Sequence, residues 1–154
     1  MRPCPYPVQD LLLLTPPALL LDEVVEWDET GLLAALRITP ASRFFQASRG
    51  VPVHVGIEYM AQGCGAFAGL SAREGKRPVQ RGFLLGTRKF RSSIDWFPDG
   101  AHVEIVVHVE LMEGEMAVFA CTIKCDGNAV ASARLTVYQP FDERLGTVDR
   151  QGSK

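Results

Sequence analysis

The sequence predicts an α+β domain in which a curved antiparallel sheet wraps around one central glycine-rich helix. Residues 52–69 (PVHVGIEYMAQGCGAFAG) mix apolar and small side chains as a buried helix does, and several later segments are rich in Val, Ile, Thr or Phe at alternate positions. With 154 residues, of which 47% are hydrophobic, the chain is of a size to bury one core. We therefore expect one domain over residues 1–140, followed by a flexible polar tail over residues 141–154.

The residues before the helix predict four elements in order. Residues 10–14 form a short helix or turn, and residues 18–27 are largely apolar and predict an extended segment. A second strand is expected over residues 32–38. Residues 40–50 carry turn-forming residues at both ends and predict a loop that leads into the helix.

The central helix is expected to begin after Pro52 and to end before Gly75 and Pro78. Each glycine inside a helix costs about 1 kcal/mol relative to alanine, so a close approach of another backbone or side chain must compensate for several of them. Strands packed tightly against the helix would supply that approach. The glycines concerned are Gly56, Gly63, Gly65 and Gly69.

Four strands are expected after the helix, at residues 83–87, 102–112, 116–124 and 128–138. The last three follow one another closely, which is typical of an antiparallel meander. The pair Asp126-Gly127 between the last two strands predicts a tight hairpin, because a type I′ turn needs positive φ at both central positions.

The overall composition excludes several classes of protein. A formal net charge of −2 argues against a general nucleic-acid-binding protein. The four cysteines form no CxxC pair, so we expect reduced thiols and no metal site. Residues 15–17 (TPP) interrupt the leucine-rich N-terminal region before it could span a membrane, and the chain starts without the features of a secretory signal. These observations predict a cytoplasmic protein with no membrane association.

Glu58 is the main candidate for chemistry, because it is a carboxylate within a helix that is expected to be buried. It falls in the first turn or two of that helix, where the helix dipole and unpaired N–H groups favour an anion or a developing oxyanion. Apolar surroundings would shift such a carboxyl group toward the pKa of a general acid or base. The alternative is a solvated or ion-paired helix residue.

Five segments resemble a known family of enzymes. The chain is similar, over roughly residues 10–140, to hotdog-fold dehydratases of the 3-hydroxyacyl-(acyl carrier protein) type, and most closely to their aryl-polyene-associated branch. The combination of VGIEYMAQ with GFLLGTRKF at this spacing is the most specific part of the resemblance. The matching segments are TPPALLLDEV (15–24), VPVHVGIEYMAQ (51–62), GFLLGTRKF (82–90), FPDGAHVEIVVHVE (97–110) and ARLTVYQP (133–140).

This resemblance implies a role for Glu58 and also reveals a departure from the family. In the family, the matching helix carboxylate faces a histidine from the partner subunit across a dimer interface. The pair removes an α-proton from a 3-hydroxyacyl thioester and protonates the departing hydroxyl. Here the position of the catalytic histidine falls on Phe44, and the family's other common histidine is replaced by Leu14.

Three residues near Glu58 are further candidates for the site. His54 lies one helical turn before Glu58 and could replace the missing histidine, or it could be a capping or surface residue. Gln62 lies one turn after Glu58 and could orient its carboxylate, or it could only pack the helix. Gly56 and the neighbouring N–H groups are candidates for polarising the thioester carbonyl.

The resemblance also places Phe83 and Gly86 along the tunnel for the acyl chain, although both could belong to an ordinary strand packed on the helix.

Seven basic residues and only Glu74 as an acidic residue lie between positions 73 and 91. This excess suits an acidic carrier protein or the phosphates of pantetheine or coenzyme A, and its alternative is a solvated loop. The basic residues are Arg73, Lys76, Arg77, Arg81, Arg88, Lys89 and Arg91.

Three functions remain open from the sequence. The first is a 3-hydroxyacyl thioester dehydratase of fatty-acid or polyene type synthesis, a homodimer or higher oligomer with the site at its interface, and no cofactor beyond a substrate carried on phosphopantetheine or coenzyme A. The second is a hotdog thioesterase that uses Glu58 alone. The third is a non-catalytic acyl-binding subunit that pairs with an active homologue.

Overall fold

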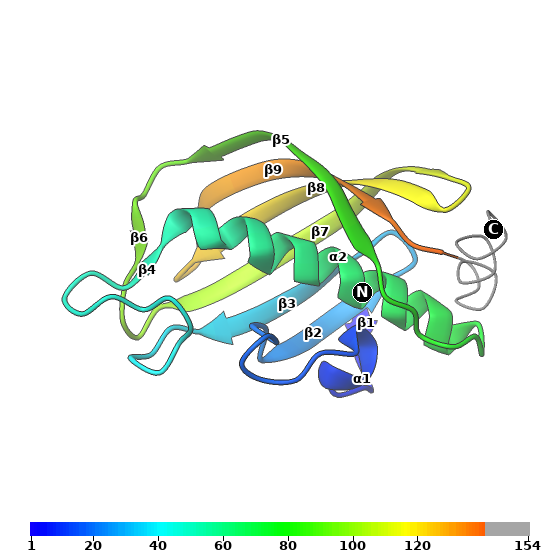
Figure 1. The fold of residues 1–154 in the computed structure, drawn as a ribbon, viewed down its shortest axis with the longest axis horizontal. Coiled ribbons are helices and arrows are strands. Elements are labelled where there is room, and N and C mark those ends of the chain that lie inside the picture. The colour runs from blue at the N-terminus through cyan, green and yellow to red at the C-terminus, as the bar shows by residue number, and fades with distance from the viewer. Residues whose placement is uncertain (141–154) are drawn as a thin grey trace, which may run out of the picture.

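The computed structural model describes residues 1–140, so the expected tail, residues 141–154, lies outside the described residues. Within these residues, seven strands form one antiparallel sheet in the order β1-β2-β3-β7-β8-β9-β5, which curves around a single long helix (Figure 1). The α+β class predicted from the sequence is confirmed. The strands are β1 Arg2–Pro3, β2 Glu23–Asp28, β3 Gly31–Arg37, β5 Phe83–Ser92, β7 His102–Glu113, β8 Met116–Cys125 and β9 Asn128–Tyr138.

The long helix α2 spans Gly56–Glu74 and lies across the inner side of the sheet (Figure 1). A single 3-10 turn, η1 at Val53–Val55, precedes it, so regular α-helix begins four residues after Pro52. Two short strands, β4 at Val51–Pro52 and β6 at Trp96–Phe97, pair with each other and fix the start of the helix.

The core lies between α2 and the long strands. In β7, Val103, Ile105 and Val107 are fully buried, while residues between them are less buried. The same alternation continues through β8 and β9, as expected for a sheet with one covered face. The apolar residues of α2 that meet this face are Tyr59, Met60, Cys64, Phe67 and Leu70.

The glycines of α2 allow close approach, as the sequence predicts. A Cβ atom on Gly63 would lie 3.0 Å from Val107 Cγ1, and one on Gly69 would overlap the carbonyl oxygen of Leu11. The first glycine therefore faces the sheet and the second faces the short helix α1, Gln9–Leu12. Glycine at both positions removes the side-chain atoms that would push these elements apart.

The hairpin between β8 and β9 is also confirmed. Asp126 and Gly127 have φ values of 50° and 90°, so both central positions are in the left-handed region that the turn requires.

The segment predicted as extended over residues 18–27 forms a strand only from Glu23 onward. Before that point, the Ala18 carbonyl and the Leu20 N–H are bonded to the side chain of Gln62 instead of to a neighbouring strand. The apolar composition alone could not show whether these backbone groups bond a neighbouring strand or a side chain.

The short helix or turn predicted at residues 10–14 is present as the helix α1, which ends at Leu12 because Leu13 is in the left-handed region. Its Leu11 is buried, and α1 packs against α2. No helix within residues 1–140 is long and apolar enough to cross a bilayer.

Candidate active site

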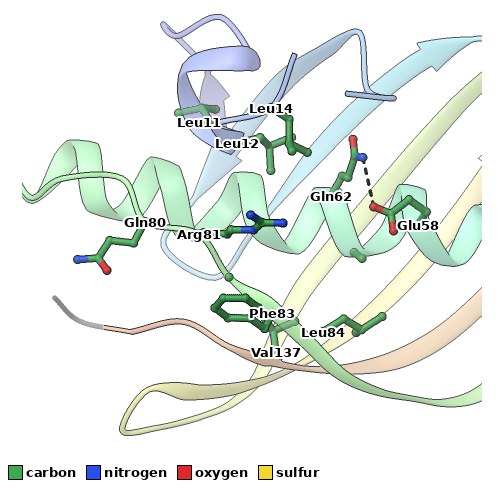
Figure 2. Close-up of a pocket in the computed structure, with 13 residues that line it drawn as sticks. Leu11, Leu12, Leu14, Glu58, Gln62, Gln80, Arg81, Phe83, Leu84 and Val137 are labelled. Carbon is green, nitrogen blue, oxygen red and sulfur yellow. Dashed lines mark hydrogen bonds between the residues drawn. The ribbon is translucent and has the colours of Figure 1, made fainter. Parts of the chain in front are cut away.

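Glu58 lies in the first turn of α2, and its side chain is exposed. The expectation of a buried carboxylate is therefore wrong for the single chain. Tyr59 and Met60, the next two residues, turn toward the core and are almost completely buried. Glu58 instead points away from the sheet into an open groove (Figure 2).

The groove has a volume of about 230 Å³ and runs along one face of α2 (Figure 2). Four parts of the chain form its walls: α1 with the residues that follow it, the helix α2, the segment that enters β5 with the start of that strand, and Val137 of β9. Its charged residues are Glu58 and Arg81, and most of the others are apolar or small. The lining residues are Leu11, Leu12, Leu14, Glu58, Ala61, Gln62, Gly65, Gln80, Arg81, Gly82, Phe83, Leu84 and Val137.

Gln62 connects Glu58 to the fixed part of the structure. Its Nε2 donates to Glu58 Oε1 at 3.3 Å and to the Ala18 carbonyl at 2.9 Å, and its Oε1 accepts from the Leu20 N–H at 2.9 Å. The side chain is only 4% exposed. Both alternatives considered for Gln62 therefore apply, because it anchors the segment at residues 18–20 and also contacts the carboxylate.

His54 lies in the 3-10 turn before α2, and its side chain is exposed. Within residues 1–140, no hydrogen bond or ion pair joins it to Glu58. The other two histidines belong to β7, where His102 lies 3.8 Å from Glu104 and His108 is exposed. None of the three lines the groove. The described part of the chain supplies Glu58 with an amide neighbour and no imidazole.

Gly56 is buried at the start of α2. A Cβ atom at this position would lie 2.7 Å from Ile123 Cδ1, so this glycine serves the packing of the helix on the sheet. Its N–H is directed to the Val53 and His54 carbonyls within the 3-10 turn. The amide is engaged inside the chain and does not line the groove.

The two positions that lack the family's histidines are placed differently. Leu14 lines the groove that contains Glu58. Phe44 lies in the loop between β3 and β4, is 51% exposed and has a φ of 70°. The guanidinium of Arg43 lies 5.0 Å from the centre of its ring. Phe44 does not reach the groove of its own chain.

Of Phe83 and Gly86, only Phe83 lines the groove. Phe83 lines the groove at the start of β5. Gly86 lies further along the same strand, does not line the groove, and has open space around the position of a Cβ atom.

The basic residues divide into three groups. Arg73, Lys76 and Arg77 lie at or just beyond the end of α2, and all three are exposed. Arg81 lies in the groove itself. The third group, Arg88, Lys89 and Arg91, is exposed on β5.

Sequence reasoning missed the contribution of α1 to the groove. Leu11 and Leu12 form one wall, and Gln80 lies at the end of the groove away from Glu58 (Figure 2). The leucine run at residues 11–14 carried the signal, but its position beside α2 depends on Gly69, through which the two helices approach. That contact is not visible from composition.

The arrangement provides one carboxylate at an apolar groove, oriented by a buried amide. Such a carboxylate can transfer a proton to or from a bound substrate. Residues 1–140 contain no group of three or more His, Cys, Asp or Glu residues placed to hold a metal ion.

Solved structures share this architecture. The chain is 26% identical to a chain of the dehydratase heterocomplex ApeI:P from Xenorhabdus doucetiae, with a TM-score of 0.84, and the match covers 93% of this chain and 97% of the other. A hypothetical thioesterase from Streptococcus pneumoniae, solved with coenzyme A, is 12% identical with a TM-score of 0.59 over 75% of this chain and 83% of that one.

The E. coli PaaI protein from the phenylacetic acid degradation operon is 9% identical, with a TM-score of 0.60 over 75% of this chain and 81% of that chain. At such low identity, the thioesterase and PaaI show only the shared fold. No curated protein matches the chain.

The family comparison covers most of the sequence. A family model described as ApeP-like, ApeP dehydratase, matches residues 6–146. The sequence motifs, the helix with its carboxylate and the match to the ApeI:P structure agree with this result. The chain belongs to the ApeP-like dehydratase family.

Proposed function

We propose that this chain is the carboxylate-bearing subunit of a dehydratase that acts on 3-hydroxyacyl thioesters in fatty-acid or polyene type synthesis. The observation that carries the proposal is Glu58, which lies at an apolar groove and is contacted by the anchored side chain of Gln62. The groove accommodates an acyl chain between α1, α2 and the start of β5.

The reaction needs two proton transfers. A base removes a proton from C2 of the substrate, an acid protonates the hydroxyl at C3, and water leaves as the C2–C3 double bond forms. Glu58 and one imidazole together can carry out both transfers, and such acid–base catalysis contributes about 10²- to 10⁴-fold to a rate. Gln62 holds the carboxylate in place but cannot perform either transfer.

We propose that a partner subunit supplies the imidazole. Glu58 is exposed in the single chain, the groove is open, and β5 forms an edge of the sheet. An edge strand has unpaired backbone groups that can bond a strand of another chain. Three consecutive apolar side chains of β5 are exposed as well: Phe83 at 43%, Leu84 at 43% and Leu85 at 56%.

The identity of the partner follows from the missing histidine. A second copy of this chain, as in the homodimer predicted from the sequence, would present Phe44 where the family has its catalytic histidine. A homologue that retains the histidine would complete the site. The related structure from Xenorhabdus is a heterocomplex, which supports the second arrangement.

We further propose that the substrate is carried on phosphopantetheine, attached to an acyl carrier protein or to coenzyme A, and that no other cofactor takes part. Arg81 in the groove, and the exposed Arg73, Lys76, Arg77, Arg88 and Lys89, can attract the phosphate and an acidic carrier. The four cysteines are free thiols in the structure, which suits the cytoplasmic location predicted from the sequence.

The proposal is tested by purifying the chain alone and together with a histidine-bearing dehydratase homologue. We expect enoyl thioester to form from a 3-hydroxyacyl pantetheine thioester only with the complex, and no free thiol to be released. Thiol release by the chain alone would assign a thioesterase instead. Binding of the thioester by the complex without any turnover would assign a non-catalytic acyl-binding subunit.

A further inference from the structure

A second pocket lies on another face of α2 and shares no lining residue with the groove at Glu58. Its volume is about 440 Å³, which is within the range of small-molecule sites. The double-proline segment and the residues after it form one wall, and the end of β3 with the following loop forms the other. Tyr59 of α2 also lines it.

Tyr59 has an unpartnered hydroxyl group. The residue as a whole is only 2% exposed, and no hydrogen bond joins its hydroxyl to another residue in the described part of the chain. The hydroxyl oxygen is not among the fully buried polar atoms that lack a partner, so it borders the pocket. A phenol hydroxyl can both donate and accept a hydrogen bond, so this group is free to bond a molecule in the pocket. Burial and the nearby Asp22 carboxylate both raise the pKa of the Tyr59 phenol, which therefore remains protonated and able to donate.

The charges around the pocket are separated. Asp22 lies near Tyr59, and its Oδ2 accepts from the Arg37 N–H at 2.8 Å. Arg43 reaches from the opposite wall toward the Pro17 carbonyl at 3.5 Å. Within residues 1–140, Arg43 has no carboxylate partner, so most of its donors are available to an anion.

Apolar side chains complete the lining. Leu19 and Leu20 come from one wall and Leu36 from the other. Arg37 also lines this wall, with its guanidinium donating to the Gly100 carbonyl at 2.8 Å. The pocket thus combines an apolar surface, the more available cation Arg43 on one wall and a hydrogen-bonding hydroxyl on the helix. Each of these features can bind a different part of one amphiphilic molecule.

We propose that this pocket binds a small amphiphilic anion, with its carboxylate or phosphate on Arg43, its apolar part on the leucines and a hydroxyl or amide group on Tyr59. This site is separate from the reaction assigned to Glu58. Two sources supply such chemistry: a free 3-hydroxy fatty acid, which carries a carboxylate, and the phosphopantetheine arm, which carries a phosphate and two amides.

The test measures binding of 3-hydroxyoctanoate and of pantetheine 4′-phosphate to the full chain by ligand-observed NMR and by thermal shift. We expect at least one of them to bind with a Kd of about 1 mM or tighter. Tyr59→Phe should weaken that binding by about threefold to tenfold, and Arg43→Gln by about tenfold or more, as expected for loss of a neutral and of a charged hydrogen bond.

Two control variants separate the pocket from general effects. Tyr6→Phe removes a phenol hydroxyl that bonds Glu74 at 2.7 Å, and Arg49→Gln removes an exposed guanidinium that lies 5.4 Å from the Trp96 ring. Neither residue lines the pocket. Both variants should bind the probe as the wild-type chain does.

Because the Tyr59 hydroxyl has no protein partner, Tyr59→Phe should melt at or above the wild-type temperature without ligand. The proposal is overturned if neither probe binds at about 1 mM, or if the bound probe is unaffected by Tyr59→Phe and Arg43→Gln. Binding of only the hydroxy acid or only the pantetheine phosphate supports the pocket and identifies the source of the anion.

Discussion

The two sides of α2 differ in how far their contacts are satisfied within the chain. On the side that faces the sheet, Met60, Cys64 and Phe67 are buried, and Gly63 allows the helix to approach β7. On the side of the groove, Glu58 is exposed, and the neighbouring strand β5 exposes a row of apolar side chains. One side satisfies its contacts within the chain, whereas the other presents groups that need an additional molecule.

This difference teaches that stability and chemistry are separable along one helix. Substitutions on the sheet side should unfold the chain. Substitutions on the groove side should leave the chain folded and impair assembly or turnover. Gln62 is the exception, because it is buried and yet contacts Glu58.

The largest effect is expected from a charge on the exposed edge. Leu85→Lys places a cation on β5, where Leu85 is 56% exposed, so the isolated chain should melt as the wild type does. Because a charged edge strand resists pairing with another strand, assembly with the partner should be lost, and turnover with it. Light scattering and the enoyl assay measure the two effects.

The matched control for this variant is Val25→Lys, since Val25 is an apolar residue of β2 that is 38% exposed. It should assemble normally. Normal assembly of the Leu85→Lys chain would show that β5 is not the interface.

A smaller effect is expected from Gln62→Leu. This variant tests the one residue that both stabilises the fold and contacts the groove carboxylate Glu58. The Leu20 N–H and the Ala18 carbonyl lose their partner, so the free energy of unfolding should fall by about 1–3 kcal/mol. The kcat of the complex should fall as well, because the Glu58 carboxylate loses its contact.

Chemical denaturation and the enoyl assay check these two outcomes. Gln46→Leu is the control, since Gln46 is exposed in the loop before β4, and this change should alter stability by less than about 0.5 kcal/mol. A Gln62→Leu chain with wild-type stability would contradict the anchoring role.

The smallest effect is expected from Gly69→Ala, on the side of α2 that meets α1. The added methyl group would overlap the Leu11 carbonyl oxygen, and such overpacking costs about 1–3 kcal/mol. Alanine returns roughly 1 kcal/mol of helix propensity, so the net loss should be at most about 2 kcal/mol by denaturation.

Gly86→Ala is the matched control, because no atom lies within 4 Å of the position of its Cβ atom. Its stability should remain within about 0.5 kcal/mol of wild type. If both alanine variants were equally stable, the close contact between α1 and α2 would not limit stability.

Most of the fold could be predicted from the sequence. The alternating residues of β7, β8 and β9 and the turn at Asp126-Gly127 are local signals, and local signals survive in a single sequence. The irregular segment at residues 18–20 could not be predicted, because its Ala18 carbonyl and Leu20 N–H are bonded to a side chain more than forty positions away, Gln62.

The candidate site could be predicted only in part. Glu58 and Gln62 share a helix face by their spacing, and the structure brings them together. The exposure of Glu58 depends on which sides of α2 the sheet and α1 cover, and this is set by tertiary packing. The wall formed by Leu11 and Leu12 depends on the same packing.

The most direct test of the central claim is the kcat/KM for dehydration of a 3-hydroxyacyl pantetheine thioester by the complex of this chain with its histidine-bearing partner. Glu58→Gln should lower it by about 10²- to 10⁴-fold, while assembly and melting temperature remain those of the wild type. Wild-type turnover by the Glu58→Gln complex would contradict the account.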